Sequence, residues 1–260
     1  MLKQYKPTLD KLAKIVGKSH VLIDEQDTRH YRQGIRFGEG KVLAVVCPGT
    51  LLEQWQALQT IIEADCVVIM QAANTGLTGG STPYGDDYDR PVIIMSTRRL
   101  QGIQVILDGK QVVCLPGATL DNLERTLKPY NREPHSVIGS SCIGASVLGG
   151  VCNNSGGALV RRGPAYTEMA LYARVNESGE LELINHLGID LGNTAEEILT
   201  RLQKQDYETG QVTTQTTQLA SDNRYAHDVK QVDADSPARF NADPTRLYEA
   251  SGSAGKVCVF

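Results

Sequence analysis

Alternating apolar and polar blocks in the first hundred residues predict a β-α-β unit. Val42–Val46 and Cys66–Met70 are apolar runs of strand length, typical of strands that are buried on both faces. Between them, Thr50 and Glu53 form a capping box that begins a helix. The apolar stripe of this helix consists of Leu51, Trp55, Leu58 and Ile62. The unit therefore predicts a parallel strand pair joined by a right-handed crossover.

The remaining pattern mixes helices, strands and hairpins. A helix at residues 9–17 precedes a polar stretch that extends to about residue 41, and Thr119 can cap a helix bearing Leu120, Leu123 and Leu127. Further strands are predicted at Val92–Met95, Ile103–Leu107, Gln111–Leu115, Ala170–Val175 and Leu181–Asn185, with a polar surface excursion at 204–222. This order predicts an α+β fold with mixed sheets flanked by helices.

Two glycine-rich stretches carry the candidate chemistry. The first, QAANTGLTGGS at residues 71–81, follows a predicted strand, and no Lys or Arg lies between Met70 and Arg90. An anion held there would be neutralised by backbone N–H groups, which suits a diphosphate. The second stretch, at 139–157, contains six glycines, and we expect it to be a loop that lies against a flat, extended ligand. Together the two loops can hold the two ends of a dinucleotide.

Two familiar phosphate-binding motifs are missing. The chain has neither GxxxxGK[ST] nor GxGxxG, and the first glycine-rich loop leads into a strand and does not begin a helix. An alternative remains open, in which both glycine-rich stretches are structural turns of a module that binds no cofactor.

Composition and charge limit the other function classes. The chain has 260 residues, with 26 Lys and Arg against 30 Asp and Glu, for a formal net charge of −4. This balance argues against neutralisation of nucleic-acid phosphates, so no nucleic-acid partner is expected. The six cysteines form no CxxC pair, and the five histidines form no HxxxH or HExxH pattern, so no metal site is predicted. No apolar run approaches the length of a membrane-spanning helix.

At the glycine-rich stretches the sequence resembles a known family. QAANTGLTGGS resembles the pyrophosphate loop of the vanillyl-alcohol-oxidase-type, or PCMH-type, FAD-binding fold, and residues 116–157 resemble its second FAD-contacting region. Four further segments, at 22–40, 88–97, 163–192 and 235–256, are similar to the bacterial quinone-dependent D-lactate dehydrogenases, a family of respiratory flavoenzymes. The resemblance covers nearly the whole chain and fails mainly at 204–230.

The resemblance implies a site for noncovalently bound FAD. In that family two subdomains hold the cofactor between them; here they would be residues 1–100 and 101–260 of one FAD-binding domain. No His in 71–81 could form a histidyl-flavin link there. The matching positions are Ala72, Ala73, Asn74, Thr75, Gly76, Gly80 and Ser81 for the pyrophosphate, Gly139, Ser146 and Gly156 for the flavin half, and Val259 near the flavin or adenine end.

The implied activity is oxidation of D-lactate to pyruvate, with electrons passed to membrane quinone. The family's enzymes continue through a substrate domain and a basic membrane-contacting region, and this chain stops at Val257–Phe260 as a strand begins. We therefore expect this chain to be a truncated FAD-binding portion that is itself soluble and is not expected to be active alone. The whole enzyme is expected to lie peripherally on the cytoplasmic side of the inner membrane. No catalytic residue is assigned. The alternatives are an enzyme for another 2-hydroxy acid, such as glycolate or 2-hydroxyglutarate, and a non-catalytic FAD-binding fragment.

Overall fold

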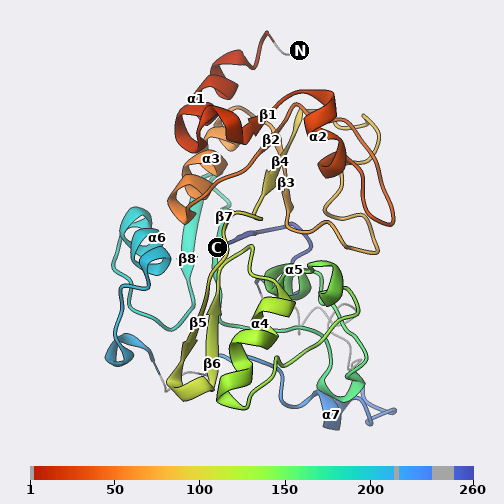
Figure 1. The fold of residues 1–260 in the computed structure, drawn as a ribbon, viewed down its shortest axis with the longest axis vertical. Helices are drawn as coiled ribbons and strands as arrows, with labels where there is room; N and C mark the ends of the chain where they lie inside the picture. Colours follow the sequence, from red (N-terminus) through yellow and green to blue (C-terminus); the bar gives the residue numbers. More distant parts are fainter. Residues whose placement is uncertain (1–2, 214–216, 236–248) are drawn as a thin grey trace. The chain divides into compact units, whose positions relative to one another are not determined.

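The chain divides into two units, Met1–Gln101 and Gly102–Phe260, in the computed structural model (Figure 1). The structure describes residues 3–213, 217–235 and 249–260. Parts of two segments discussed above, the polar excursion at 204–222 and the matching segment at 235–256, therefore lie outside the described residues. Each unit is described by itself.

The sheet of the first unit has four strands in the order β1-β2-β4-β3. β1 is antiparallel to β2, whereas β2, β4 and β3 run parallel, and the register pairs Val45 with Ile94 and Ile94 with Ile69. β4 is buried throughout, as expected of a parallel strand covered on both faces. The strands are β1 (Val21–Leu22), β2 (Ala44–Val46), β3 (Val67–Gln71) and β4 (Val92–Ser96).

Three helices cover this sheet. α1 (Lys6–Val16) and α3 (Leu51–Glu63) contact each other and lie beside the strands opposite α2 (Glu25–Arg32) (Figure 1). The capping box is confirmed in part. The Thr50 hydroxyl accepts a hydrogen bond from the Glu53 amide at 3.1 Å, but the Glu53 carboxylate accepts one from the Gly49 amide, at 2.6 Å, one residue before the expected position.

Some predictions for the first unit were wrong in detail. The polar stretch after residue 17 contains β1 and α2. The sequence did not predict α2, because this helix is so polar that it shows no apolar stripe, and only Thr28 in it is buried. Ile61, and not Ile62, is buried on α3. The strands β2 and β3 are parallel, but they are not neighbours, because β4 lies between them.

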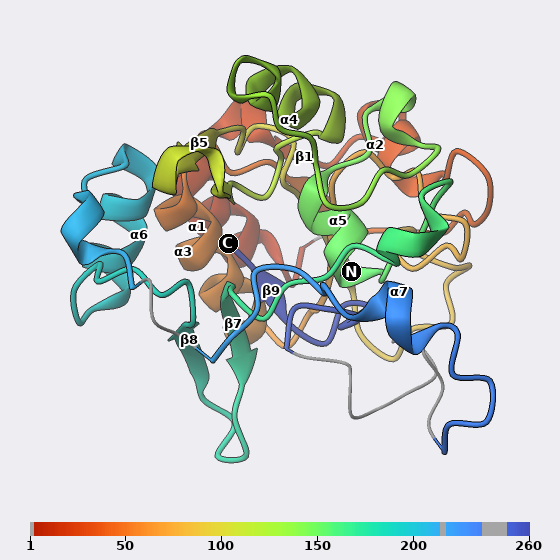
Figure 2. The same cartoon turned by 90° about the horizontal axis from the view of Figure 1, so that it is seen from below.

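The second unit contains two antiparallel sheets. The hairpin β5-β6 pairs Ile103 with Cys114, and the three-stranded sheet has the order β8-β7-β9. The β7-β8 hairpin extends to a turn at residues 176–179 (Figure 2). The predicted strand near the end of the chain is confirmed as β9, which pairs with β7. The strands are β5 (Ile103–Ile106), β6 (Gln111–Cys114), β7 (Leu171–Val175), β8 (Leu181–Asn185) and β9 (Cys258–Val259).

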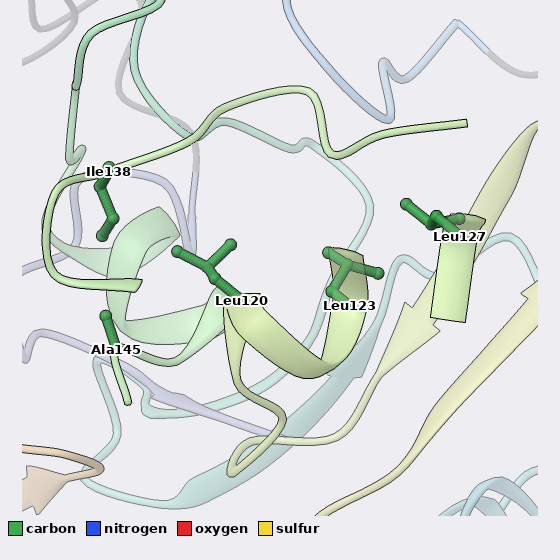
Figure 3. Packing of buried hydrophobic residues seen from close by; sticks show 5 residues of the cluster. All are labelled: Leu120, Leu123, Leu127, Ile138 and Ala145. Carbon is green, nitrogen blue, oxygen red and sulfur yellow. The ribbon is translucent and has the colours of Figure 1, made fainter. Parts of the chain in front are cut away.

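The α-helices in the described part of the second unit are α4 (Leu120–Leu127), α5 (Val147–Cys152), α6 (Ala195–Lys204) and α7 (Tyr225–Asp228). The expected stripe of α4 is confirmed, since all three leucines are buried and Thr119 accepts a hydrogen bond from the Asn122 amide at 3.2 Å. These leucines pack with Ile138, just before the second glycine-rich stretch, and with Ala145, inside it (Figure 3). Thus the core of the second unit fixes the start of that stretch. Among the described residues, no helix is both long and apolar enough to cross a bilayer.

Candidate functional site

The first glycine-rich loop leaves the carboxyl edge of the parallel strands. β3 ends at Gln71, and residues 72–81 follow it directly. The carboxyl ends of β2 and β4 meet at the same edge, because all three strands are parallel. In open α/β sheets this edge is where ligands commonly bind.

Asn74 holds this loop in shape. Its side-chain amide Nδ2 donates to the Gln33 carbonyl at 2.9 Å. Its Oδ1 accepts hydrogen bonds from the hydroxyls of Ser81, at 2.9 Å, and Thr82, at 2.7 Å. Asn74 is 8% exposed and has φ 56°, in the left-handed region that Asn tolerates better than most residues. The side chains of Asn74 and Ser81 are therefore engaged with the protein and position the loop.

Gln71 is a second anchor that the sequence reasoning missed. It is only 2% exposed, and its Nε2 donates to the carbonyls of Tyr31, at 2.9 Å, and Ser81, at 2.6 Å. The loop is thus tied at both ends to the end of α2. A polar residue that closes an apolar strand was the available signal, because a buried amide side chain requires partners.

The middle of the loop offers unused hydrogen-bond donors. Within the described part of the chain, no amide of residues 75–81 donates to a protein acceptor. Gly76 is exposed, and a Cβ there would meet nothing nearer than the Ser81 hydroxyl, 4.0 Å away. Consecutive free N–H groups beside open space are what an anion-binding nest requires.

The second glycine-rich stretch is less irregular than expected. Residues 147–152 form helix α5, despite Gly149 and Gly150. Ser146 caps it, accepting a hydrogen bond from the Gly149 amide at 3.0 Å. The prediction of a continuous loop was therefore wrong, because this cap and the burial of Gly150 and Val151 compensate for the low helix propensity of glycine. The Ser146 side chain is 4% exposed and is committed to the cap.

The glycines on either side of α5 have different surroundings. A Cβ at Gly139 or Gly156 would meet nothing within 4 Å, so both positions face open space. A Cβ at Gly157 would lie 2.0 Å from the Val137 carbonyl oxygen, a contact that no side chain can make. Gly157 therefore serves the packing of the loop, whereas Gly139 and Gly156 leave room for a ligand.

Val259 belongs to an apolar cluster of the second unit. It is 9% exposed and packs with Val151, Ala170, Tyr172 and Ala250. Val259 also lines a cavity of about 470 Å³ in this unit. Val151 belongs to α5, so the structure brings Val259 together with a helix that lies more than a hundred residues earlier in the chain.

The family to which the chain belongs identifies the ligand of these loops. The family model of the FAD-binding domain matches residues 42–182, which include both glycine-rich stretches. The chain belongs to the FAD-binding domain family. FAD is the cofactor of this family, and the loops fit it: the free amides of residues 75–81 can bind a diphosphate, and three glycines face open space.

Curated relatives of this FAD-binding chain have one name. The quinone-dependent D-lactate dehydrogenase of Haemophilus influenzae is 61% identical over 252 residues, which are 97% of this chain and 44% of the relative. The enzyme of the same name from Escherichia coli is 58% identical over 255 residues, 98% of this chain and 44% of the relative. The chain therefore spans somewhat less than half the length of these relatives.

Solved structures confirm the predicted α+β, PCMH-type fold. Alkyldihydroxyacetonephosphate synthase matches 75% of this chain and 37% of its own, at TM-score 0.58 and 15% identity. A p-cresol methylhydroxylase matches 74% of this chain and 37% of its own, at TM-score 0.53 and 16% identity. At this identity the likeness concerns the fold alone.

The thiols of the FAD-binding chain differ in their surroundings. Burial raises the pKa of Cys114 to about 12 and that of Cys152 to about 11, so both stay protonated near neutral pH. Cys142, three residues after Gly139, is exposed. No group of three or more potential metal ligands occurs in residues 3–213, 217–235 and 249–260.

Proposed function

We propose that this chain is the FAD-binding part of an enzyme that oxidises D-lactate to pyruvate and passes the electrons to a membrane quinone. The observation that carries the proposal is the identity of about 60% with two quinone-dependent D-lactate dehydrogenases along almost the entire chain. Such identity extends far beyond the glycine-rich loops, which many FAD-binding proteins share.

The loop of the first unit would hold the diphosphate of FAD. Backbone amides of Thr75, Gly76, Gly80 and Ser81 are the candidate donors, because residues 75–81 have no described protein acceptor. Ala72 and Ala73, which are half-buried at the start of the loop, would add close backbone contacts. Asn74 would act by holding the loop, since its side-chain oxygen and nitrogen are already bonded.

In the second unit, Gly139 and Gly156 would face the flavin half of the cofactor, because open space surrounds both. Ser146 would act by capping α5, and Val259 would contribute apolar surface beside that helix. The stretches 71–81 and 139–157 contain no His, so noncovalent binding is expected. When bound, FAD would be the two-electron oxidant that accepts the hydrogen at C2 of D-lactate.

The proposed partners of the whole enzyme are D-lactate, a quinone and, at its cytoplasmic face, the inner membrane. The formal net charge of −4 on this chain favours no contact with anionic lipid, so attachment would be peripheral and made elsewhere in the enzyme. No nucleic-acid partner is proposed for the same reason of charge.

Gly76→Val should abolish most FAD binding without unfolding the chain. The new side chain would fill the space beside the free amides, and no described atom lies close enough to clash with its Cβ. We expect FAD affinity to fall roughly tenfold to a hundredfold, as expected when several hydrogen bonds to a charged group are lost. Titration with FAD, followed by the visible flavin absorption band, measures this.

Gly210→Val is the matched control, because Gly210 is also exposed and its Cβ would meet nothing within 4 Å. The control should bind FAD like the original chain. If the Gly76→Val chain bound FAD with the same affinity as the unsubstituted chain, the assignment of the loop to the diphosphate would be wrong. A chain that gains no flavin absorption on addition of FAD would contradict the cofactor role itself.

The substrate is tested with a chimera, in which this chain replaces the matching part of the Escherichia coli relative. We expect the resulting chimera to oxidise D-lactate with a quinone analogue, because the exchanged part is 58% identical over 98% of this chain. Glycolate, D-2-hydroxyglutarate and L-lactate should react at least tenfold more slowly, by the ordinary discrimination of a binding pocket. A preference for one of those acids would favour the alternative function, and the unmodified relative is the control.

A further inference from the structure

Two arginines lie at the edge of the sheet from which the first glycine-rich loop leaves. Arg98 and Arg99 follow β4, whose last residue is Ser96. The amide of Thr97, which lies between Ser96 and Arg98, donates to the Gln71 carbonyl at 2.8 Å, so the segment after β4 is joined directly to the end of β3. Residues 72–81 begin at that same point. Positive charge that is distant in sequence is thus brought to the loop by the parallel pairing.

The two arginines differ in what they contact. Arg99 Nη1 donates to the Cys47 carbonyl at 2.6 Å, and a Cβ at Gly49 would lie 2.7 Å from Arg99 Nη2. Arg99 therefore braces the turn between β2 and α3. Arg98 is exposed, and its guanidinium has no hydrogen-bond or ion-pair partner within the described ranges. A charged group without a protein partner is available to a ligand.

The side of the sheet to which Arg98 belongs follows from its neighbours. Ile94 packs in one cluster with Tyr31 and Cys47, and alternation carries Ser96 to the same side. The charge of Arg98, in the turn after β4, acts on both Tyr31 and Cys47. Gln71 is paired in register with Ser96, and its side chain holds both Tyr31 and the loop. Burial raises the pKa of Tyr31, and the nearby Arg98 charge opposes that rise. Arg98 therefore lies on the side of the sheet to which the loop is tied.

Acidic residues with ion-pair partners gather at the opposite edge of the sheet. Asp86 pairs with Lys41 at 2.6 Å, just before β2. Arg90, just before β4, pairs with Asp65 at 3.0 Å and Asp89 at 3.2 Å. These cations at the amino edge are neutralised, whereas Arg98 at the carboxyl edge is not. This separation of charge favours an anion at the carboxyl edge.

We infer that Arg98 is the cationic side chain that contacts the diphosphate of FAD. The inference rests on the proposed FAD role of the 72–81 loop and adds a side chain that is absent from the loop itself. Backbone amides carry only partial charges, and a guanidinium adds a full charge with donors that match phosphate oxygens. Arg98 thus binds the cofactor and takes no part in the chemistry of the substrate.

Arg98→Gln should weaken FAD binding roughly tenfold to a hundredfold, in line with the loss of a charge-assisted hydrogen bond. FAD affinity of the 260-residue chain is measured by flavin fluorescence at two salt concentrations. Riboflavin, which has no diphosphate, is titrated in parallel, and its affinity should not change. Arg98→Lys should restore part of the FAD affinity, because it keeps the charge but loses the planar pair of donors.

Arg90→Gln is the matched control, because it removes an arginine that flanks the other end of the same strand. It should leave FAD affinity unchanged within about twofold. Unchanged FAD affinity in Arg98→Gln would overturn the inference, and so would an equal loss for riboflavin. Failure of the unsubstituted chain to bind FAD would instead overturn the proposed cofactor role, so the two failures are distinguishable.

Discussion

Replacing Gly157 with alanine is expected to destabilise the second unit by about 2–3 kcal/mol, at the upper end of the range for overpacking. The new Cβ would lie 2.0 Å from the Val137 carbonyl oxygen and 2.9 Å from the Ile138 Cα. Both atoms are backbone, so no side-chain rotation relieves the contact. Ile138 belongs to the cluster with the α4 leucines, so a backbone shift at residue 138 would disturb that core. Thermal denaturation followed by far-ultraviolet circular dichroism measures the loss.

Gly156→Ala is the control in the adjacent position. Its Cβ would meet nothing within 4 Å, so the stability should change by less than about 0.5 kcal/mol, as for other surface substitutions. FAD affinity of Gly156→Ala should nevertheless fall, because the methyl group would occupy space proposed for the cofactor. If the two variants melted alike, the distinction between a packing glycine and a ligand-facing glycine would be wrong.

Asn74→Ala should abolish FAD binding by disordering the first loop. The substitution leaves the Gln33 carbonyl and the hydroxyls of Ser81 and Thr82 without their common partner. It also places alanine at φ 56°, which costs on the order of 1 kcal/mol. With roughly 1 kcal/mol for each lost hydrogen bond, the total is about 3–4 kcal/mol, and FAD affinity should fall by a hundredfold or more.

The chain contains one tryptophan, Trp55 on α3 of the same unit, so denaturant unfolding followed by its fluorescence measures the stability loss. Asn74→Gly should recover only the part that arises from backbone strain, since glycine adopts this φ freely. Thr78→Ala, in the exposed middle of the loop, is the control and should leave stability unchanged. A stable Asn74→Ala chain that keeps its FAD affinity would show that Asn74 does not support the loop.

The sequence predicted most strands and the capped helices because their signals are local. Apolar runs marked β2, β3 and β4, and hydroxyl caps marked α3 and α4, where Thr50 and Thr119 accept amide hydrogen bonds as expected. It did not predict α2, whose polar residues show no apolar stripe and whose Tyr31 packs on a sheet that forms later in the chain. The same limit explains the missed insertion of β4 between β2 and β3, because strand order depends on pairing between distant segments.

For the candidate site, the sequence located both glycine-rich stretches but did not separate their roles. The cofactor contacts expected of Asn74, Ser81 and Ser146 stay predictions, and the structure adds that the side chains of all three bond to neighbouring protein groups. Glycine in a sequence indicates freedom of the backbone. Only the neighbouring atoms tell whether the missing side chain makes room for another segment, as at Gly157, or leaves open space, as at Gly156.

The sequence by itself determined the α+β class and the positions of the two glycine-rich stretches, because apolar periodicity and glycine spacing are local features of the chain, and its resemblance to known flavoenzymes indicated the FAD-binding family. The tertiary structure alone decided which polar side chains brace the loops and which exposed cation follows the strand beside β3. Arg98 is seventeen residues beyond Ser81 and shares no motif with the loop, yet parallel pairing of β3 with β4 brings their ends together. Hydrogen bonds and charge act through space, so contacts of this kind follow from strand order.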